Sequence, residues 1–314
     1  TLRFELTLLG TSAALPTANR FASAALLRSE KTSVLLDCGE GTQIRLQQAG
    51  LGLGKCAHIL LTHLHGDHYF GLPGLLSSLA LNGRTKPLTI VSPEPIEPRL
   101  RVLFEGAHFP FPFELRFVVI AATEPTRLED SGELEVTAFP LRHRVPTNGY
   151  LLREKARQGN IRKEKLAEYA IPWQAIAAIK TGGDFTQPNG TVVPHEELVT
   201  EALPSRAYAH CSDTLYFPEL AEYIRGVDLV YHEATFLHDL LEDAIQKGHA
   251  TALQAGMVAR DAGAKTLVLG HFSTRYADGR AHEAEAKTVF ANTYAGEDLW
   301  RFAVPFSRRT VVAS

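Results

Sequence analysis

Thr62-His63-Leu64-His65-Gly66-Asp67-His68 places three histidines and one aspartate within six positions, directly after the short apolar run 58–61. That run predicts a buried strand, so these side chains leave the sheet together at its carboxyl end. Neutral imidazoles and a carboxylate suit Zn²⁺, and a loop can direct His63 and His65 to one point while Asp67 and His68 face a second. A chance cluster of histidines is the alternative, but buried polar groups need partners. The segment therefore predicts half of a site for two metal ions.

Three further candidate ligands follow other predicted strands. His143 comes after the strand 134–139, Asp213 after 207–210, and His271 after 266–269. Ligand sites in sheet proteins form at the carboxyl ends of strands. Each residue alone could be an ordinary surface or capping residue, but with the first cluster they complete a two-metal site that Asp213 could bridge. The predicted metal ligands are His63, His65, Asp67, His68, His143, Asp213 and His271.

Composition sets the class of protein. The chain has 314 residues, 45% of them hydrophobic, which is enough for one large α/β domain or two closely joined halves. Its formal charge of -3 means that nucleic-acid binding would need a local basic patch. The three cysteines show no disulfide or zinc spacing and favour a reducing cytoplasm. No run approaches the roughly 18 apolar residues of a membrane span, and the strand-like start predicts no signal peptide. We expect a cytoplasmic protein with no membrane partner.

Alternating strand and helix patterns predict an α/β fold. Apolar runs bounded by turn residues predict strands at 2–9, 24–27, 33–36, 58–61, 88–91, 115–121, 134–139, 149–152, 207–210, 229–231 and 266–269. Helical patterns cover 39–48, 71–81, 98–104, 218–224 and 251–262. A β-rich opening followed by βαβ units predicts sheets covered by helices on their outer faces.

The segment 153–165 differs from the rest because it carries six basic and two acidic residues in a chain that is acidic overall. Ile171-Pro172-Trp173 and glycine-rich turns follow it, which indicates an insertion that projects from the fold. Its basic side chains could pair with nucleic-acid phosphates without reading sequence. The alternative is a solvated charged helix over 163–169. The candidate substrate-binding residues of the insertion are Arg153, Lys155, Arg157, Arg162, Lys163 and Lys165.

The pattern Thr-His-x-His-x-Asp-His, followed by a single His, an Asp and a His, resembles the metallo-β-lactamase superfamily. More closely, the chain resembles the short form of ribonuclease Z, the tRNA 3′-processing endonuclease, over nearly its whole length. The closer match rests on 9–17 with Arg20, 37–42, 232–236, 249–252 and 270–276. The chain departs from that family at 211–215, Ala250 and 171–175. The resemblance implies a four-layer αββα sandwich over 1–314, with a flexible substrate-binding arm inserted at about 153–180.

The resemblance also implies the roles of the site residues. His63, His65 and His143 would hold one metal ion, and Asp67, His68 and His271 the second, with Asp213 bridging. His249 would protonate the leaving 3′ oxygen, Glu233 would orient it, and Asp67 could also take a proton from the attacking water. The acid pair is chemically sensible, because a carboxylate partner raises the basicity of an imidazole. An ordinary residue at a helix start is the alternative for His249. Arg275 could hold a substrate phosphate or be structural.

The implied activity is removal of the 3′ trailer from precursor tRNA by attack of metal-activated water, which leaves a 3′-hydroxyl on the tRNA and a 5′-phosphate on the trailer. The implied cofactors are two zinc ions per chain, with Mn²⁺ possible, and the implied assembly is a homodimer. One alternative is a phosphodiesterase or esterase of the same fold that acts on a small substrate. Another is a non-catalytic RNA-binding relative, which predicts broken ligands, and none is broken. The other histidines fit no motif and are taken as ordinary: His58, His108, His195, His210, His238 and His282.

Overall fold

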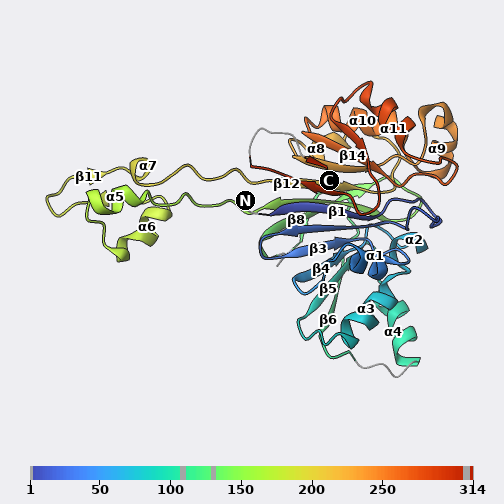
Figure 1. Cartoon of the computed structure of the whole chain (residues 1–314), viewed down its shortest axis with the longest axis horizontal. Helices are drawn as coiled ribbons and strands as arrows, with labels where there is room; N and C mark the ends of the chain where they lie inside the picture. Colours follow the sequence, from blue (N-terminus) through green and yellow to red (C-terminus); the bar gives the residue numbers. More distant parts are fainter. Residues whose placement is uncertain (1–2, 107–110, 129–131, 307–311, 314) are drawn as a thin grey trace. The chain divides into compact units, whose positions relative to one another are not determined.

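The computed structural model describes residues 3–106, 111–128, 132–306 and 312–313. The chain forms two compact units: the first contains 1–153 and 206–314, and the second contains 154–205. The first unit has the predicted α/β architecture, with two large mixed sheets and helices (Figure 1).

The first sheet, as far as the described residues show, has eight strands in the order β17-β16-β1-β2-β3-β4-β5-β6. Strands β3 to β6 run parallel, and β1 pairs antiparallel with both β2 and β16. The strands are β1 (Phe4–Gly10), β2 (Ala24–Ser29), β3 (Ser33–Leu36), β4 (Cys56–Leu60), β5 (Leu88–Ser92), β6 (Leu115–Val119), β16 (Arg301–Ala303) and β17 (Val312–Ala313).

The second sheet has the order β15-β14-β13-β12-β9-β8-β7. Strands β12 to β15 run parallel, whereas β9 lies antiparallel to β12 and pairs Arg153 with Ala207. The strands are β7 (Thr126–Leu128), β8 (Leu134–Leu141), β9 (Thr147–Glu154), β12 (Ala207–Cys211), β13 (Leu229–Glu233), β14 (Thr266–Gly270) and β15 (Thr293–Ala295).

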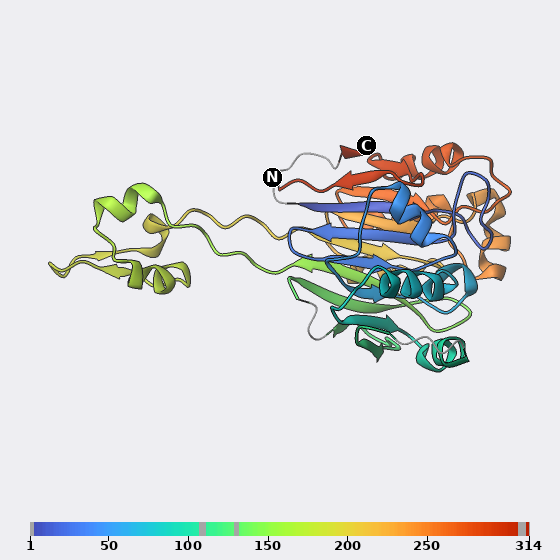
Figure 2. The same cartoon turned by 60° about the horizontal axis from the view of Figure 1, so that its bottom comes forward.

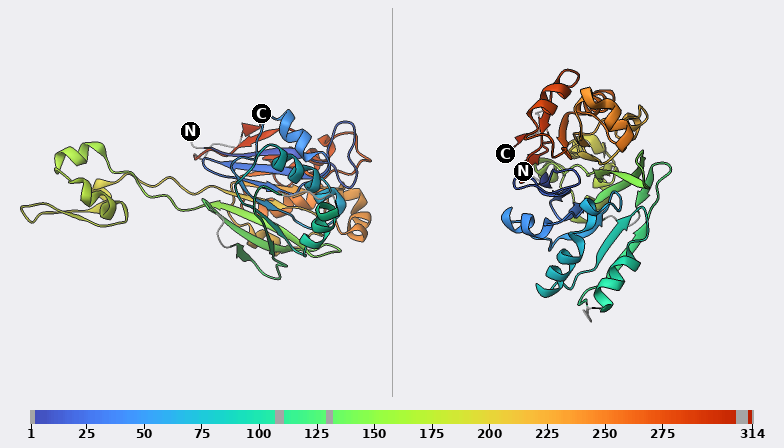
Figure 3. Two further views of the ribbon diagram at one scale, coloured as in Figure 1. Left: turned by 90° about the horizontal axis from the view of Figure 1, so that it is seen from below. Right: turned by 90° about the vertical axis from the view of Figure 1, so that its right-hand side faces the viewer.

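Helices cover the outer faces of the two sheets (Figure 3), and Figure 2 shows α1 and α3 lying across the first sheet. The helices of the first half are α1 (Thr42–Gln48), α2 (Gly66–Tyr69), α3 (Leu72–Leu81) and α4 (Glu97–Gly106). The helices of the second half are α8 (Leu220–Tyr223), η2 (His238–Leu240), α9 (Leu241–Lys247), α10 (Ala252–Asp261) and α11 (Arg280–Lys287).

Three buried apolar clusters lie between the layers, and successive side chains of a strand contribute to different clusters. In β2, Leu27 points into the cluster shared by both sheets, whereas Leu26 points to the cluster under α1 and α3. In β13, Leu229 contacts the central cluster and Val230 the cluster under α10. Successive side chains of a strand face opposite sides, so a strand covered on both faces is apolar at every position. These three apolar interfaces establish the αββα sandwich that the family resemblance implied.

The second unit has a small core of its own, made of Ile171, Ile179, Val193, Leu198 and Val199. The predicted insertion at about 153–180 is therefore shorter than the structural unit, because the later residues 193–199 are needed to complete this core. The elements of the unit are α5 (Lys163–Glu168), η1 (Trp173–Ala175), α6 (Ile176–Lys180), β10 (Phe185–Thr186), β11 (Val192–Val193) and α7 (His195–Leu198).

The longer boundary also changes the charge of this unit. Over 154–205 the six basic residues, which include Lys180, meet seven acidic residues, which include Glu196, Glu197 and Glu201. The excess of positive charge is thus confined to 153–165 and does not extend over the whole unit.

All eleven predicted strands and all five predicted helices have counterparts in the structure, with ends that differ by a few residues. Helices α9 and α11 and the short strand β15 were not predicted. No helix among the described residues is both long and apolar enough to span a lipid bilayer.

Candidate active site

The predicted metal ligands come together at one edge of the sandwich. His63 and His65 follow β4, Asp67 and His68 lie in the short helix α2, and His143, Asp213 and His271 follow β8, β12 and β14. The two sheets are joined at this edge by hydrogen bonds. The Tyr150 hydroxyl of β9 donates to the Leu61 carbonyl at 2.7 Å, and the Asn148 amide donates to the Thr62 carbonyl at 2.8 Å.

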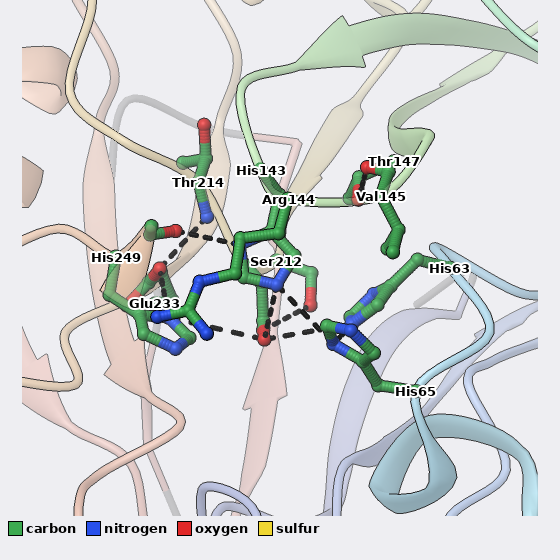
Figure 4. A network of polar contacts seen from close by, with 12 residues as sticks. His63, His65, His143, Arg144, Val145, Thr147, Ser212, Thr214, Glu233 and His249 are labelled. Carbon is green, nitrogen blue, oxygen red and sulfur yellow. Dashed lines mark hydrogen bonds and ion pairs between the residues drawn. The ribbon is translucent and has the colours of Figure 1, made fainter. Parts of the chain in front are cut away.

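The first group of candidate ligands contains His63, His65, His143 and Asp213. Figure 4 labels its three histidines. His65 Nδ1 lies 3.0 Å from His63 Nε2 and 3.3 Å from His143 Nε2. Asp213 Oδ2 lies 3.7 Å from His63 Nε2 and 3.9 Å from His143 Nε2. Three imidazole nitrogens and one carboxylate oxygen therefore converge on a single point.

The second group contains Asp67, His68 and His271, and the other oxygen of Asp213 faces it. Asp67 Oδ2 lies 3.4 Å from the Nε2 atoms of both histidines. Asp213 Oδ1 lies 3.5 Å from His68 Nε2 and 3.3 Å from His271 Nε2. The Asp213 carboxylate thus presents one oxygen to each group, which is the geometry of a bridging ligand.

These separations fit metal coordination. Zinc–nitrogen bonds of about 2.0–2.1 Å in a tetrahedral site put neighbouring ligand atoms about 3.3 Å apart. The ligand atoms of both groups lie close to that spacing. His68 Nε2 is also fully buried and makes no hydrogen bond to any described residue. A buried nitrogen without a hydrogen bond is costly unless a cation fills the position. The residues present therefore fit a pair of metal ions.

Neighbouring groups fix which nitrogen three of the histidines present, and sequence reasoning assigned none of these groups. Asp37 Oδ2 lies 2.8 Å from His68 Nδ1, so that ring donates Nδ1–H and turns its Nε2 inward. The Gly248 carbonyl accepts from His143 Nδ1 at 2.7 Å, and Thr235 Oγ1 lies 3.0 Å from His271 Nδ1. Such outer partners orient metal-binding imidazoles and raise their basicity. The position of Asp37 after β3, in the family-like segment 37–42, was the available signal.

Charge in the site follows from the same carboxylates. Burial opposes a charge on His68, but Asp213, Asp67 and Asp37 outweigh burial and hold the pKa of that imidazole well above its usual range. Burial likewise raises the pKa of the Asp213 carboxyl, but the surrounding histidines, with His271 and His68 foremost, hold it well below its usual range. The buried carboxylates thus create a negative field at the point where the imidazoles meet.

The Asp213 segment departs from the family sequence, and the structure gives the departure a contact. Ser212 stands where the family usually has glycine, and its hydroxyl lies 3.2 Å from Asp213 Oδ1 (Figure 4). Cys211 before it is buried in the outer core beneath α10. The Ser212 hydroxyl therefore donates a hydrogen bond to the carboxylate that faces both candidate groups.

His249 and Glu233 form a pair beside the metal-ligand groups. His249 Nδ1 lies 2.9 Å from Glu233 Oε1 and 4.0 Å from Asp213 Oδ2. Glu233 is fully buried and also accepts hydrogen bonds from the Thr214 amide and from the amide and hydroxyl of Thr235. The cap of helix α10 is Thr251, whose capping box leaves His249 outside the helix. His249 is therefore not needed as a helix cap.

The carboxylate partner changes the protonation of His249. Burial lowers the pKa of this imidazole, but the charge and hydrogen bond of Glu233 outweigh burial and raise the pKa to about 9. An imidazolium that is stable near neutral pH can give a proton to a leaving group. The pair consequently has the chemistry of a general acid with an orienting carboxylate.

A pocket of about 370 Å³ opens over these residues. His65, Asp67, His143, Asp213, His249 and His271 all line it, together with the loop residues Ala13, Ala14 and Leu15. Arg144 and Lys247 line it as well, although neither was predicted as a substrate-binding residue. Arg275 is not among the described residues that line the pocket; its guanidinium lies over the Phe236 ring and 3.6 Å from Asp243.

Several predicted arm residues make contacts within the second unit. Arg157 pairs with Glu154 at 2.7 Å, Arg162 donates to the Val199 carbonyl, and Lys165 pairs with Glu168 and Glu197. Lys155 and Lys163 are exposed, and Arg153 is half-buried in β9.

Of the histidines taken as ordinary, His108 lies outside the described residues. The others do not belong to either candidate ligand group. His210 is buried in β12, where it stacks on Tyr231 and lies 2.7 Å from the Tyr208 hydroxyl. His282 is buried between the rings of Phe272 and Tyr276. His210 and His282 therefore pack against neighbouring rings outside the candidate ligand groups.

Comparison with known proteins decides the family. Ribonuclease Z of Parabacteroides distasonis is 38% identical over 301 residues, which cover 96% of this chain and 99% of the relative. Ribonuclease Z of Bacteroides thetaiotaomicron is 40% identical over 291 residues, covering 93% of this chain and 92% of the relative. The chain belongs to the ribonuclease Z family. As a member of this family it is a metal-dependent nuclease.

Solved structures agree on the architecture of this ribonuclease Z family member. Human tRNase Z, short form, superposes with a TM-score of 0.69 at 28% identity, covering 96% of this chain and 99% of the human chain. The metallo-beta-lactamase fold protein YhfI from Bacillus subtilis gives 0.66 at 20% identity over 96% of this chain and 99% of its own, which supports the fold alone. A sequence-family model described as anti-Pycsar protein Apyc1 matches residues 4–147.

Proposed function

We propose that this enzyme removes the 3′ trailer from precursor tRNA by hydrolysing one phosphodiester bond. The products are a tRNA with a 3′-hydroxyl and a trailer with a 5′-phosphate. Relatives named ribonuclease Z at 38–40% identity, and human tRNase Z among the solved structures, support the choice of substrate. The observation that carries the chemistry is the His249–Glu233 pair at 2.9 Å, beside the carboxylate that faces both ligand groups.

The proposed cofactors are two zinc ions per chain, with Mn²⁺ as the other metal that accepts the same ligands. One would be held by His63, His65 and His143, the other by Asp67, His68 and His271, with Asp213 shared. When bound, such a pair supplies Lewis acidity, which lowers the pKa of a water and neutralises charge on the phosphodiester.

The chain's own residues would then manage the protons. His249, protonated through its contact with Glu233, donates a proton to the 3′ oxygen as the bond to phosphorus breaks. Glu233 positions the imidazole, because three hydrogen bonds from Thr214 and Thr235 hold the carboxylate in place. We assign Asp67 the second task of accepting a proton from the attacking water. The Ala14 amide donates to Asp67 Oδ2 at 2.9 Å and fixes its orientation.

The second unit is proposed to be the substrate arm, which contacts precursor tRNA away from the cut. Positive charge is concentrated in the segment 153–165. Lys155 and Lys163 are exposed there, and the other basic residues are Arg153 and the three that bond to neighbours within the unit, Arg157, Arg162 and Lys165. Contacts between such side chains and phosphates position RNA without reading its sequence. Assembly as a homodimer and a cytoplasmic location remain predictions of the family resemblance.

The test is incubation of the purified enzyme with a precursor tRNA, followed by mapping of the cut and of its end groups. We expect one cut at the 3′ side of the tRNA, a 3′-hydroxyl on the tRNA, and loss of cleavage with a chelator. Asp213→Ala should abolish cleavage and reduce bound metal, because each candidate ligand group loses one oxygen of the carboxylate between them. Cuts at scattered sites, or cleavage that persists with the chelator, would overturn the proposal.

A second candidate function is hydrolysis of a small phosphodiester. Every residue of the two candidate ligand groups, and the His249–Glu233 pair, lies in the first unit, so the proposed catalytic machinery does not depend on the arm for any side chain. The partial match to the anti-Pycsar family model falls in the same unit. Cleavage of bis(4-nitrophenyl) phosphate with no cleavage of precursor tRNA would favour this function.

A further inference from the structure

We propose that Arg144 and Lys247 together bind the phosphate immediately upstream of the cut, on the tRNA side of the cleaved bond. The inference rests on the proposed function and names a part of the substrate site that no sequence motif indicated. Of the described residues that line the pocket, Arg144 and Lys247 alone carry a permanent positive charge. Both are exposed, so both can meet a substrate.

The two side chains are held in place before any substrate arrives. Arg144 Nη2 donates to the Gln246 carbonyl at 2.9 Å, which occupies one of the five N–H groups of the guanidinium. Lys247 Nζ lies 5.3 Å from the centre of the Phe236 ring, and Phe236 is only 2% exposed. A cation that is already positioned loses less entropy when it binds a phosphate. Their placement therefore favours a binding role over that of freely solvated surface charges.

Both cations lie next to the proposed proton donor. Lys247 is two residues before His249 in the chain. Arg144 follows His143, whose ring centre lies 5.2 Å from that of His249 (Figure 4). The 246–248 turn accepts hydrogen bonds from both Arg144 and His143, so these residues form one edge of the pocket.

The geometry of in-line displacement indicates which side of the cleaved bond lies along this edge of the pocket. The attacking and leaving oxygens lie on opposite sides of the phosphorus atom, and the leaving oxygen must face His249. The nucleotide that carries the leaving 3′ oxygen therefore passes the His249 edge, and its own 5′-phosphate comes within reach of Arg144 and Lys247. The lining residues on the other loops, Ala13, Ala14, Leu15, Ser273 and Thr274, carry no charge. The lining residues that would face the trailer thus offer no positive charge to a phosphate on that side of the cut.

The experiment pairs a double variant with neutralised phosphates. Arg144→Gln/Lys247→Gln is compared with the wild type on three precursor tRNAs: unmodified, with a neutral methylphosphonate one nucleotide upstream of the cut, and with one downstream. On unmodified substrate we expect the double variant to lose about tenfold or more in kcat/KM, as expected when charge-assisted hydrogen bonds are removed. The wild type should lose a similar factor on the upstream-modified substrate, whereas the variant should lose nothing further.

Two measurements separate phosphate binding from damage to the site. Hydrolysis of bis(4-nitrophenyl) phosphate, which has no neighbouring phosphate, should fall by a much smaller factor in the double variant than cleavage of precursor tRNA does. The dependence of log kcat/KM on log salt should become shallower by about 0.7 for each phosphate that the variant no longer neutralises. The control Arg101→Gln/Lys86→Gln removes two charges that are exposed and outside the pocket, and should lack the upstream effect.

The outcomes are distinct. A further loss by the variant on the upstream-modified substrate, or equal coupling to the downstream phosphate, would overturn the assignment. So would unchanged cleavage of unmodified precursor by the variant. A wild-type enzyme that leaves precursor tRNA uncut would instead overturn the proposed function, and this inference with it.

Discussion

Replacing Glu233 with glutamine removes the negative charge from the His249 pair while nearly preserving its shape. Glu233 Oε1 lies 2.9 Å from His249 Nδ1. Burial lowers the pKa of the imidazole, but the charge and hydrogen bond of Glu233, with a smaller contribution from the charge of Asp213, raise the pKa to about 9. At pH 7.5 an acid of pKa 9 is roughly 97% protonated, whereas one of pKa 6.5 is roughly 9% protonated. If the protonated form is active, the variant should turn over roughly tenfold more slowly at this pH.

The sign of the pH dependence follows directly. Activity that needs a protonated His249 is lost as the pH rises through its pKa, so the falling limb of the kcat profile should move to lower pH in Glu233→Gln. Metal cations bound beside Asp213 would lower the pKa of His249 in the wild type and in the variant alike. The falling limb of the variant would therefore still lie at lower pH than that of the wild type. The assay is kcat against pH on precursor tRNA, with Glu222→Gln, an exposed residue of α8, as the matched control.

Stability must be measured alongside. The wild-type carboxylate accepts from the Thr214 amide on one oxygen and from the Thr235 amide on the other. A glutamine NH2 group cannot accept, so one of these amides would face a donor, at a cost of about 1–3 kcal/mol. The pH profile is therefore recorded below the melting temperature of the variant. A limb that stays in place, or moves to higher pH, in the folded variant would refute the role of Glu233.

His249→Ala should slow precursor cleavage by about 10²–10⁴-fold with metal content unchanged, whereas bis(4-nitrophenyl) phosphate, whose leaving group needs no proton, should be spared; loss of metal, read by elemental analysis, would contradict the general-acid role. Asp37→Asn should weaken metal affinity by about 10–100-fold in a chelator titration, because the partner of His68 Nδ1 loses its charge; unchanged affinity would remove Asp37 from the site. Deletion of 155–204 with a short turn should preserve the fold and the small-substrate activity, because Arg153 and Ala207 are already paired neighbours, and should abolish precursor cleavage; intact tRNA processing would refute the arm.

The candidate ligands could be picked out from the sequence because their signals are local. Each candidate ligand follows a strand pattern that is read without knowing the partner strands: almost wholly buried in β4, β12 and β14, and alternating in β8. The existence of the strands was predictable for the same reason. Helix α11 was missed because its polar sequence buries only His282 and Ala286, which leaves a weak apolar pattern.

The parts that could not be predicted depend on contacts across the chain. Asp37 and His68 are 31 residues apart, and nothing in either segment reveals that one carboxylate orients the other imidazole. The two oxygens of Asp213 face different ligand groups only because β12 lies between β9 and β13 in the sheet. The end of the second unit does not follow from the basic segment, because the core of this unit closes through Val193 and Leu198, which lie about thirty residues after Lys165. Backbone conformation was also hidden: Asp37 and His271 have φ of 56° and 57°, a left-handed region that costs side-chain-bearing residues of order 1–3 kcal/mol.

One short turn links three tasks of the site. Gly248 ends α9 in the left-handed conformation with φ of 78°. Its carbonyl accepts from His143 Nδ1, the preceding Gln246 carbonyl accepts from Arg144, and His249 follows it directly. A ligand of the first group, the proposed phosphate contact and the proposed acid therefore depend on the same backbone.

Gly248→Ala should consequently impair all three tasks together. The added Cβ would lie 2.9 Å from His143 Nδ1 and 3.5 Å from Arg144 Cγ, so the ring must shift away from the Gly248 carbonyl. The left-handed conformation itself costs alanine about 1–2 kcal/mol. Gly263→Ala is the matched control, because Gly263 has φ of 63° and open space around it, and so carries the backbone cost without the collision. Both variants should lose similar stability, but only Gly248→Ala should also lose metal affinity and kcat on precursor tRNA. Equal effects of the two on catalysis would mean that the turn acts through stability alone.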